Sequence, residues 1–315
     1  MDLAGQTTSR HGYIGRFAPS PTGDLHLGSL LAAVGSYADA RHHGGRWLLR
    51  IEDLDTPRVV PGSAERILRT LEAFGLEWDG PVTYQSERLP LYRDALEQLR
   101  KSGWTFECSC SRRELGGLGD CGYPGTCRSG PKRPGVLTAT RFRMQSDSII
   151  FQDRVQGLQR LDGRELGDVV VRRKDDIIAY QLAVVVDDAD QRISDVVRGA
   201  DLLPSTGWQI ALQQALSLPT PRHAHLPLVL GPRGEKLSKS QFSVPVDPRF
   251  AASWLSIVVQ MLNKDLPVEL ERDGPAAVLA WAVSNWNIAA LAGQPSVTAR
   301  DTASAKYVGP AREMD

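Results

Sequence analysis

One segment near the start of this 315-residue chain combines residue types that suit a nucleotide-binding turn. Residues 17–29 follow a short apolar run at 13–17 and lead into a stretch with helical spacing of apolar residues, which predicts a strand, a turn and a helix. Gly23 and Gly28 lack a Cβ, so backbone and ligand can approach closely. We expect the helix start to offer N–H groups to an anion and His26 to add a donor.

A second segment, far along the chain, has the sequence Lys-Leu-Ser-Lys-Ser at residues 236–240. Lys236 and Lys239 follow a turn rich in Gly and Pro, where a mobile loop could bring an ammonium group onto phosphates. Taken alone, such a lysine loop is as often a solvated surface loop as a phosphate-binding one. The two segments together, in this order, predict a nucleotide site.

The composition favours a cytoplasmic protein of roughly two domains. No apolar run is long enough for a membrane span, and the first residues lack the apolar core of a signal peptide. Lys and Arg together number 37, as do Asp and Glu, so the whole chain exerts no general attraction on nucleic acid. Residues 128–174 hold eleven basic residues against five acidic ones, and this local excess could face a phosphate backbone or simply be a solvated surface.

The order of expected elements predicts an α/β fold with a Rossmann-type, doubly wound parallel sheet. Residues 46–51 and 195–199 read as strands, and the apolar periodicity predicts helices elsewhere. The expected helices cover residues 63–74, 89–101, 205–217, 252–262 and 275–290.

After residue 107 the composition changes and Gly and Pro become frequent, which indicates an insertion that splits this fold. No internal repeat is apparent. The expected parts are the first half of the nucleotide-binding catalytic domain at 12–107, a zinc-containing insertion at 108–175, the second half with the lysine loop at 176–245, a small helical C-terminal region at 246–295 and a flexible tail at 296–315.

All four cysteines fall within the insertion. Clustered thiols with short spacers and turn residues between them suit one structural Zn²⁺ in a chain that looks cytosolic, where disulfides are disfavoured. Free thiols are the alternative. On chemistry alone the four ligands would be the cysteines themselves, Cys108, Cys110, Cys121 and Cys127.

Charged residues that follow expected strands could form a small-molecule pocket, because ligands of an open parallel sheet bind outside the carboxyl ends of its strands. Arg198 could pair with a carboxylate through two hydrogen bonds, Arg16 gives a second cation, and Glu52 could take an ammonium group. Ser20 and Tyr180 supply hydroxyls. Each also has an ordinary structural reading, such as a surface ion pair or a packed aromatic.

The two nucleotide segments resemble the signature sequences of class I aminoacyl-tRNA synthetases, in the variant of the glutamyl enzymes. Residues 16–23, 49–58 and 197–203 also resemble blocks of glutamyl-tRNA synthetases in the same order, and the resemblance covers roughly residues 13–240. It implies that L-glutamate is bound by Arg16, Phe17, Ala18, Pro19, Ser20, Glu52, Tyr180 and Arg198. It implies that ATP is bound by His26, Gly28, Lys236 and Lys239.

The resemblance implies adenylation as the reaction. The substrate carboxylate attacks the α-phosphorus of ATP, pyrophosphate leaves, and the acyl group then passes to a hydroxyl of tRNA. His26 and Lys239 would be the catalytic residues, with Mg²⁺ on the phosphates. Ser29 stands where many class I enzymes have a second histidine, and Thr56 replaces a proline common in the family. His223 and His225 are interpreted as structural.

The cysteine segment resembles the zinc knuckle of a shorter glutamyl-type enzyme, which reads Cys-x-Cys and then Tyr-x3-Cys. This resemblance implies the ligands Cys108, Cys110, Tyr123 and Cys127, and leaves Cys121 as a spare. Residues 241–315 look too short for the helical domain with which a full glutamyl-tRNA synthetase reads the anticodon. The chain therefore resembles the glutamyl-queuosine tRNA(Asp) synthetase family.

Members of that family activate glutamate without tRNA and attach it to queuosine in the anticodon of tRNA(Asp). The partners implied are that tRNA, L-glutamate and ATP, with no membrane and no obligatory protein partner. Two alternatives stay open. One is a truncated synthetase that charges the 3′ end of tRNA(Glu), and the other is a zinc-containing tRNA-binding module without adenylation activity. Glutamine is the weaker choice of substrate, because two arginines favour a charged side chain.

Overall fold

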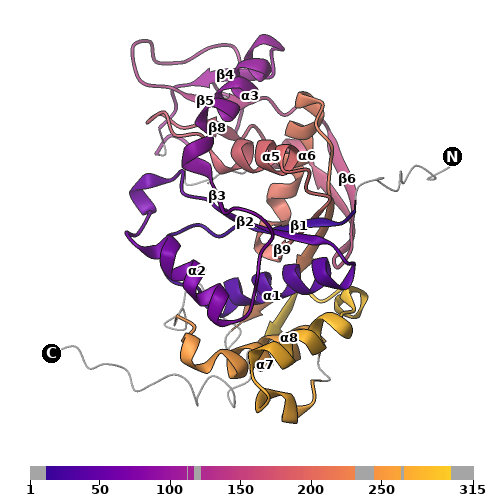
Figure 1. Ribbon diagram of the computed structural model, residues 1–315. Helices are drawn as coiled ribbons and strands as arrows, with labels where there is room; N and C mark the ends of the chain where they lie inside the picture. Colours follow the sequence, from indigo (N-terminus) through magenta and orange to yellow (C-terminus); the bar gives the residue numbers. More distant parts are fainter. Residues whose placement is uncertain (1–11, 112, 117–121, 231–244, 264–265, 299–315) are drawn as a thin grey trace.

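The computed structural model describes residues 12–111, 113–116, 122–230, 245–263 and 266–298. A central α/β body carries a small antiparallel sheet at one end and a helical C-terminal region at the other (Figure 1). Within the described residues, no helix has both the length and the apolar character that a membrane crossing requires.

The first part of the chain folds into alternating strands and helices. Strands β1, β2 and β3 pair in parallel in the order β1-β2-β3, and the short crossovers contain the helices. The elements are β1 (Ile14–Phe17), α1 (Leu27–His42), β2 (Arg46–Ile51), α2 (Ser63–Ala73), β3 (Thr83–Tyr84) and α3 (Leu89–Lys101).

A second group of strands continues this arrangement in the order β7-β6-β10-β9, where β10 is parallel to both β6 and β9. The elements are β6 (Ser148–Asp153), β7 (Gly157–Asp162), α4 (Gly163–Leu166), α5 (Tyr180–Asp190), β9 (Asp195–Gly199), α6 (Leu203–Leu216) and β10 (Arg222–Leu226). The backbone N–H of Ser194 donates to the carbonyl of Ile14 at 2.9 Å, which joins the start of β9 to β1. The expected α/β fold with parallel strands is confirmed.

The segment expected as an insertion, residues 108–175, contributes strands to two different sheets. Strands β4 (Thr105–Cys108), β5 (Ala139–Phe142) and β8 (Val170–Arg172) form a separate antiparallel sheet. The hairpin β6–β7, which lies between β5 and β8 in the sequence, instead extends the parallel group through β10. The expected bounds of 108–175 therefore include residues 148–162, which pair with the parallel strand β10.

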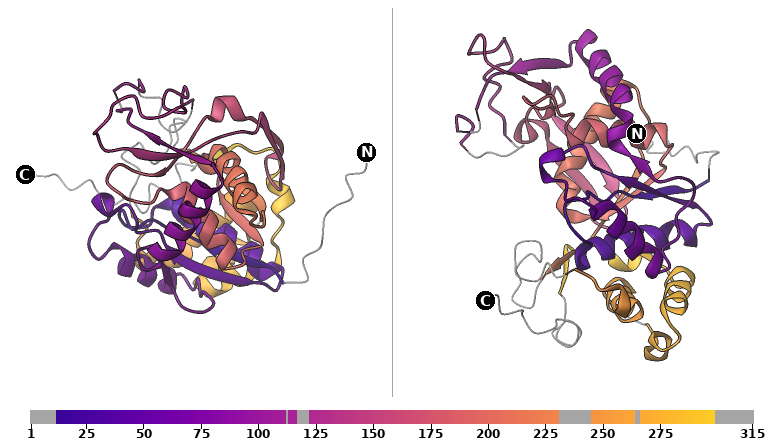
Figure 2. Two further views of the ribbon diagram at one scale, coloured as in Figure 1. Left: turned by 90° about the horizontal axis from the view of Figure 1, so that it is seen from above. Right: turned by 60° about the vertical axis from the view of Figure 1, so that its left-hand side comes forward.

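The C-terminal region packs against α1, as both figures show (Figures 1 and 2). It contains α7 (Ala251–Asn263), α8 (Pro275–Ser284) and β12 (Ser296–Thr298), which pairs in parallel with β11 (Leu228–Leu230). Residues 296–298, expected as the start of a tail, are thus a strand. Short 3₁₀ turns lie at Thr56–Arg58, Gln85–Arg88, Ala200–Leu202, Pro248–Phe250, Val268–Glu271 and Ile288–Leu291.

Three of the expected elements agree with the structure at both ends. The helix expected at 89–101 and the strands at 46–51 and 195–199 have the observed bounds. The helix expected at 275–290 is too long, because α8 ends at Ser284 and the chain turns there. Asn287 then caps a short 3₁₀ turn, its side chain accepting from the N–H of Ala289.

Helix α1 is buried on most of its surface, because the sheet covers one side and α7 and α8 cover the other. At its end, the fully buried carboxylate of Asp39 joins these layers. It accepts from Arg154 at 2.6 and 2.9 Å, from the indole N–H of Trp286 at 2.8 Å, and from the hydroxyl of Tyr13. Arg154 also contacts Asp195 at 3.3 Å.

We expect Asp39→Asn to lower the free energy of unfolding by about 2–3 kcal/mol, because the partly buried Arg154 guanidinium loses the closer of its two carboxylate partners. Chemical denaturation measures the change. Glu97→Gln is the control, since Glu97 lies in an exposed pair with Lys101 and should change stability by no more than about 0.5 kcal/mol. Equal effects of the two substitutions would contradict this role for Asp39.

Candidate active site

A large cleft of about 1390 Å³ opens at the carboxyl ends of the parallel strands. This is where an open parallel sheet places its ligand site. Its walls come from the loop after β1, the start of α1, the ends of β2 and β9, the first turn of α5 and the face of the small antiparallel sheet. Among the described residues expected to bind glutamate or ATP, all line it: Arg16, Phe17, Ala18, Pro19, Ser20, His26, Gly28, Glu52, Tyr180 and Arg198.

Arg198, near the end of β9, is a buried cation surrounded by neutral groups. It is 5% exposed. Its Nη2 donates to Thr206 Oγ1 and Gln209 Oε1, both at 2.8 Å, and its Nη1 donates to Tyr180 Oη at 3.3 Å. Within the described part of the chain, no carboxylate forms an ion pair with it. Burial lowers the pKa of this guanidinium and nearby Arg16 adds to that effect, while Tyr180, Asp188 and Glu52 oppose it.

The other two buried arginines at the same edge are paired inside the protein. Arg50 Nη2 donates to Asp188 Oδ1 at 2.7 Å, and Arg16 Nε donates to the same oxygen at 3.2 Å. Asp187 also lies 3.6 Å from Arg50. Although burial opposes its charge, these arginines hold the pKa of Asp188 below its usual range. Arg16 therefore lines the cleft as a cation that Asp188 neutralises. Arg198 lines it with only neutral hydrogen-bond partners among the described residues.

Glu52 comes directly after β2 and has an incomplete set of partners. Its Oε1 is buried and accepts no hydrogen bond, since the nearest cation atom, Arg50 Nε, is 3.7 Å away. Burial raises the pKa of Glu52 to about 7, against the attraction of Arg50 and Arg16. An ammonium group in the cleft would supply the missing donor and favour the charged carboxylate.

His26 caps α1 and thereby changes how this helix start can act. Its Nδ1 accepts from the backbone N–H groups of Gly28 and Ser29 at 3.1 and 3.2 Å, and Ser29 Oγ accepts from the His26 N–H at 2.8 Å. The expected free N–H groups for an anion are thus already used by His26 at these two positions. With Nδ1 as acceptor and burial lowering the pKa of His26, the neutral ring carries its proton on Nε2 and offers one donor there.

Gly28 is explained by the same cap. A Cβ at this position would lie 3.2–3.3 Å from the His26 ring, so a side chain would press on the capping imidazole. Ser29, where a second histidine was the family expectation, completes a capping box with His26. Lys236, Lys239 and the rest of the lysine loop lie outside the described residues.

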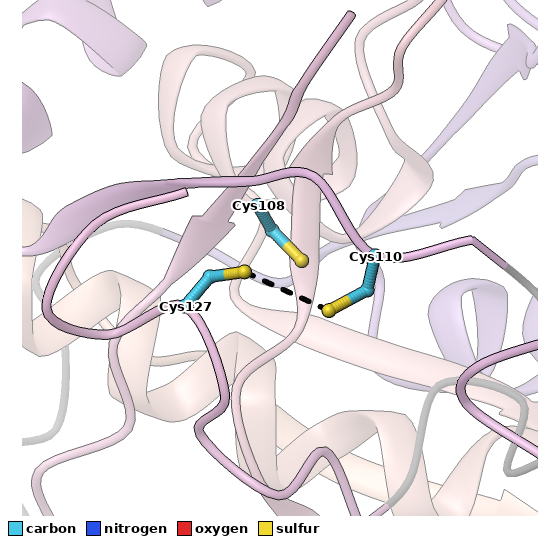
Figure 3. Close-up of side chains that lie close together, drawn as sticks. All are labelled: Cys108, Cys110 and Cys127. Atoms are coloured by element: carbon cyan, nitrogen blue, oxygen red, sulfur yellow. Dashed lines mark hydrogen bonds between the residues drawn. The ribbon is translucent and has the colours of Figure 1, made fainter. Parts of the chain in front are cut away.

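Three cysteines beside the cleft converge on one point (Figure 3). The sulfur atoms of Cys108, Cys110 and Cys127 all lie within 4.8 Å of one another, and Cys110 Sγ is 3.6 Å from Cys127 Sγ. Tetrahedral zinc with bonds of about 2.3 Å separates its sulfur ligands by about 3.7 Å. The donor set therefore fits a zinc ion. Cys121, the sequence alternative for a ligand, lies outside the described residues.

Tyr123 lies beside this cluster. Its hydroxyl oxygen is 3.3 Å from Cys108 Sγ and 3.8 Å from Cys110 Sγ, and it accepts from the backbone N–H of Cys127 at 2.9 Å. The guanidinium carbon of Arg141 lies 4.0 Å from the centre of the Tyr123 ring. The arrangement brings together the four residues that the resemblance implied, without showing a metal.

Two comparisons of sequence place the chain in a known family. The family described as tRNA synthetases class I (E and Q), catalytic domain, matches residues 14–119 and 131–263. A glutamyl-Q tRNA(Asp) synthetase of Aromatoleum aromaticum is 52% identical over 283 residues, which are 88% of this chain and 89% of that one. The enzyme of the same name from Pseudomonas aeruginosa is 51% identical over 277 residues, 87% of this chain and 94% of that one. The chain belongs to the glutamyl-Q tRNA(Asp) synthetases. It is a ligase of class I.

Solved structures agree with this assignment. A glutamate tRNA ligase of Elizabethkingia meningosepticum, in complex with its amino acid, superposes with a TM-score of 0.77 at 25% identity and covers 93% of this chain and 68% of that one. The glutamate-tRNA synthetase of Elizabethkingia anophelis gives 0.78 at 27% identity, with 93% and 69% covered. A methionyl-tRNA synthetase of Mycobacterium tuberculosis, at 13% identity and a TM-score of 0.54, shares the fold.

The basic segment of this synthetase, residues 128–174, carries less unbalanced positive charge in the structure than its sequence indicates. Six of its eleven basic residues form ion pairs with acids, and four of these six use acids from outside residues 128–174. Arg133, for example, pairs with Glu114 and Arg173 with Asp55. The excess counted along the chain is thus largely balanced in space, with Lys132 and Arg160 among the exposed exceptions.

Sequence reasoning missed the contacts of His225, which lies in β10. Its Nε2 is 3.1 Å from Arg198 Nε, and its Nδ1 is 2.6 Å from Asp153 Oδ2. Alternation along β10 could have placed His225 on a buried face, but only the parallel pairing of β10 with β9 puts it beside Arg198.

We expect Glu52→Gln to stabilise the ligand-free protein above pH 7. The folded-state pKa of Glu52 lies above the unfolded value, so the wild-type protein loses stability as the pH rises from about 4.5 to 7, and the loss amounts to about 1–3 kcal/mol. A neutral amide avoids that loss. Thermal denaturation of both proteins at pH 5 and pH 8 measures it, and a variant that is equally stabilised or destabilised at both pH values would contradict the assignment.

Proposed function

We propose that this synthetase activates L-glutamate with ATP in the absence of tRNA and transfers the glutamyl group to queuosine in the anticodon loop of tRNA(Asp). The observation that carries the amino-acid part is Arg198, a buried guanidinium held only by neutral acceptors in the described residues. A buried cation of this kind is costly until an anion reaches it. A substrate carboxylate supplies that anion.

Glu52 and Arg198 carry opposite charges, so together they match the ammonium group and a carboxylate of an amino acid. Glu52 receives the α-ammonium group at its unpartnered oxygen, and Arg198 receives a carboxylate. Tyr180 and Ser20 add hydroxyls in the same cleft, and Arg16 contributes a cation already balanced by Asp188. Glutamine would leave the Arg198 charge unbalanced if that arginine faces the side chain, so glutamate is the substrate that we propose.

We propose that ATP binds at the start of α1. The Nε2–H of His26 donates to the triphosphate, and Lys236 and Lys239 supply positive charge from the lysine loop. Mg²⁺ bound to the phosphates neutralises charge that develops as pyrophosphate leaves. The capping bonds of His26 fix its ring, so its donor is in place before the substrate arrives.

The queuosine step has support from the curated relatives alone, whose names state it. The cleft reaches from the Arg198 pocket to Cys110, Ser111 and Leu115, so there is room for a nucleoside beside the amino acid. The alternative of a synthetase that charges the 3′ end of tRNA(Glu) needs the same adenylation pocket. The acceptor therefore has to be decided by experiment.

We expect glutamate-dependent exchange of pyrophosphate into ATP without any tRNA, and labelling of tRNA(Asp) only when it carries queuosine. Arg198→Gln should raise the glutamate KM about a hundredfold or more, with little change in the ATP KM, since a charged hydrogen-bonded pair is lost. Labelling of tRNA(Glu) instead would make the enzyme a conventional synthetase. A lack of exchange in the wild-type protein would favour a tRNA-binding module.

We further propose that Cys108, Cys110, Tyr123 and Cys127 hold one structural zinc ion, with Cys121 as a spare. Zinc would fix the loops around the cluster, whose apolar surroundings are small: Phe106 and Leu115 are the main neighbours apart from the ligands. A metal is a common way to stabilise a segment with so little core. The position of the Tyr123 hydroxyl beside two sulfurs supports it as the fourth ligand.

We expect one zinc per chain, and we expect Cys121→Ser to keep it. Tyr123→Phe should weaken zinc binding about tenfold or more, because the fourth donor is lost while the ring packing is retained. Metal analysis after dialysis against a graded chelator measures both. The reverse outcome, with zinc lost from Cys121→Ser and kept in Tyr123→Phe, would assign the fourth ligand to Cys121.

A further inference from the structure

We propose that His225 and Asp153 form a dyad that positions Arg198 for its carboxylate ligand. The inference rests on the proposed function of Arg198 as the carboxylate receptor, and it adds two positioning residues to that site. His225 lies in β10, Asp153 ends β6 and Arg198 lies in β9, so three neighbouring strands contribute one residue each.

The three side chains form one continuous hydrogen-bonded chain. Asp153 Oδ2 is 2.6 Å from His225 Nδ1, and His225 Nε2 is 3.1 Å from Arg198 Nε. His225 is fully buried, Asp153 is 1% exposed and Arg198 is 5% exposed. Water therefore has little access to substitute for any of these bonds.

The chemistry of arginine fixes the proton positions along this chain. The guanidinium Nε always carries a hydrogen, so His225 Nε2 must be the acceptor. His225 Nδ1 then carries the ring proton and donates it to Asp153. Burial lowers the pKa of His225 and Arg198 adds to this effect, which agrees with a neutral ring.

Asp153 is held so firmly that it can dictate the tautomer of His225. Its Oδ1 accepts three backbone N–H groups, from Val155 at 2.9 Å, Gln156 at 2.8 Å and His225 at 3.1 Å. Its Oδ2 is left for the imidazole. A carboxylate with four donors aimed at it cannot rotate without breaking several bonds at once.

The dyad matters because the other partners of Arg198 restrain only the far end of its guanidinium. Thr206 and Gln209 hold Nη2 from α6, and Tyr180 holds Nη1 from α5. The bond to His225 fixes Nε, and two anchored ends set the plane of the group. A substrate carboxylate needs that plane, since paired bonds to a guanidinium require a shared orientation.

Asp153→Asn tests the dyad with a side chain of almost the same shape as aspartate. The Asn Oδ1 must stay toward the three backbone donors, so its NH₂ group faces His225 Nδ1. The ring then has to accept at Nδ1 and carry its proton on Nε2. That proton can go to Thr206 Oγ1, 3.2 Å away, but the Nε–H of Arg198 loses its acceptor.

We expect two effects of Asp153→Asn. Histidine side-chain nitrogen NMR should show His225 as the Nδ1–H tautomer in the wild-type protein and the Nε2–H tautomer in the variant. The glutamate KM in pyrophosphate exchange should rise about tenfold, while the ATP KM stays within about twofold, because a hydrogen bond to a charged group is lost.

His225→Gln provides the rescue. A glutamine oxygen can occupy the place of Nε2 and accept from Arg198 whatever stands at position 153. We expect its glutamate KM to stay within about threefold of wild type, and Asp153→Asn to add little in that background. A purely structural role for the two residues would give additive losses instead.

Asp195→Asn is the matched control, since Asp195 is fully buried in the adjacent strand β9 and pairs with Arg154 and Arg222 rather than Arg198. It should lower stability and leave the glutamate KM unchanged. An unchanged glutamate KM in Asp153→Asn, or a tautomer that does not switch, overturns the dyad. An unchanged glutamate KM in Arg198→Gln instead overturns the proposed function, so the two failures are distinguishable.

Discussion

The need to balance every buried charge governs the carboxyl edge of this sheet. Three arginines and three acids lie there with little access to water, and most of them neutralise one another: Arg16 and Arg50 share Asp188, and Arg50 also lies near Asp187. Among the described residues, Arg198 has only neutral hydrogen-bond partners, and the buried Oε1 of Glu52 accepts no hydrogen bond although Arg50 lies 3.7 Å away. Because an uncompensated buried charge is unfavourable, these two groups define what the cleft can bind: a molecule with one cationic and one anionic end.

The parallel topology makes this arrangement possible. Arg16, Glu52 and Arg198 come at or just after the ends of β1, β2 and β9, and the crossovers through α1, α5 and α6 return the chain so that these ends meet. The same crossovers set the helix start at His26 against the cleft. The thiol cluster lies on the antiparallel sheet whose residues Ala139 and Arg141 line the cleft, so a metal-stabilised knuckle would form one of its walls.

Local signals were sufficient for much of the fold and for the main site residues. Apolar alternation and periodicity gave the bounds of β2, α3 and β9, and each described residue expected to bind glutamate or ATP lines the cleft. Two of the expectations that differ depend on distant partners. The β6–β7 hairpin left the insertion because β10, some seventy residues later, pairs with it, and residues 296–298 form a strand because β11 offers an open edge.

The sequence by itself determined which chemistry is present: the carboxylates and guanidiniums that follow strands, a histidine at a helix start, and thiols at ligand spacing. Residue type and spacing along one element are local properties, so they can be read directly. Only the tertiary structure decided which charges are satisfied. It paired Arg16 with Asp188, gave Arg198 only neutral hydrogen-bond partners among the described residues, and placed His225 between Arg198 and Asp153. Those outcomes depend on distances between strands that the sequence separates by tens of residues, and electrostatic energy depends on distance in space.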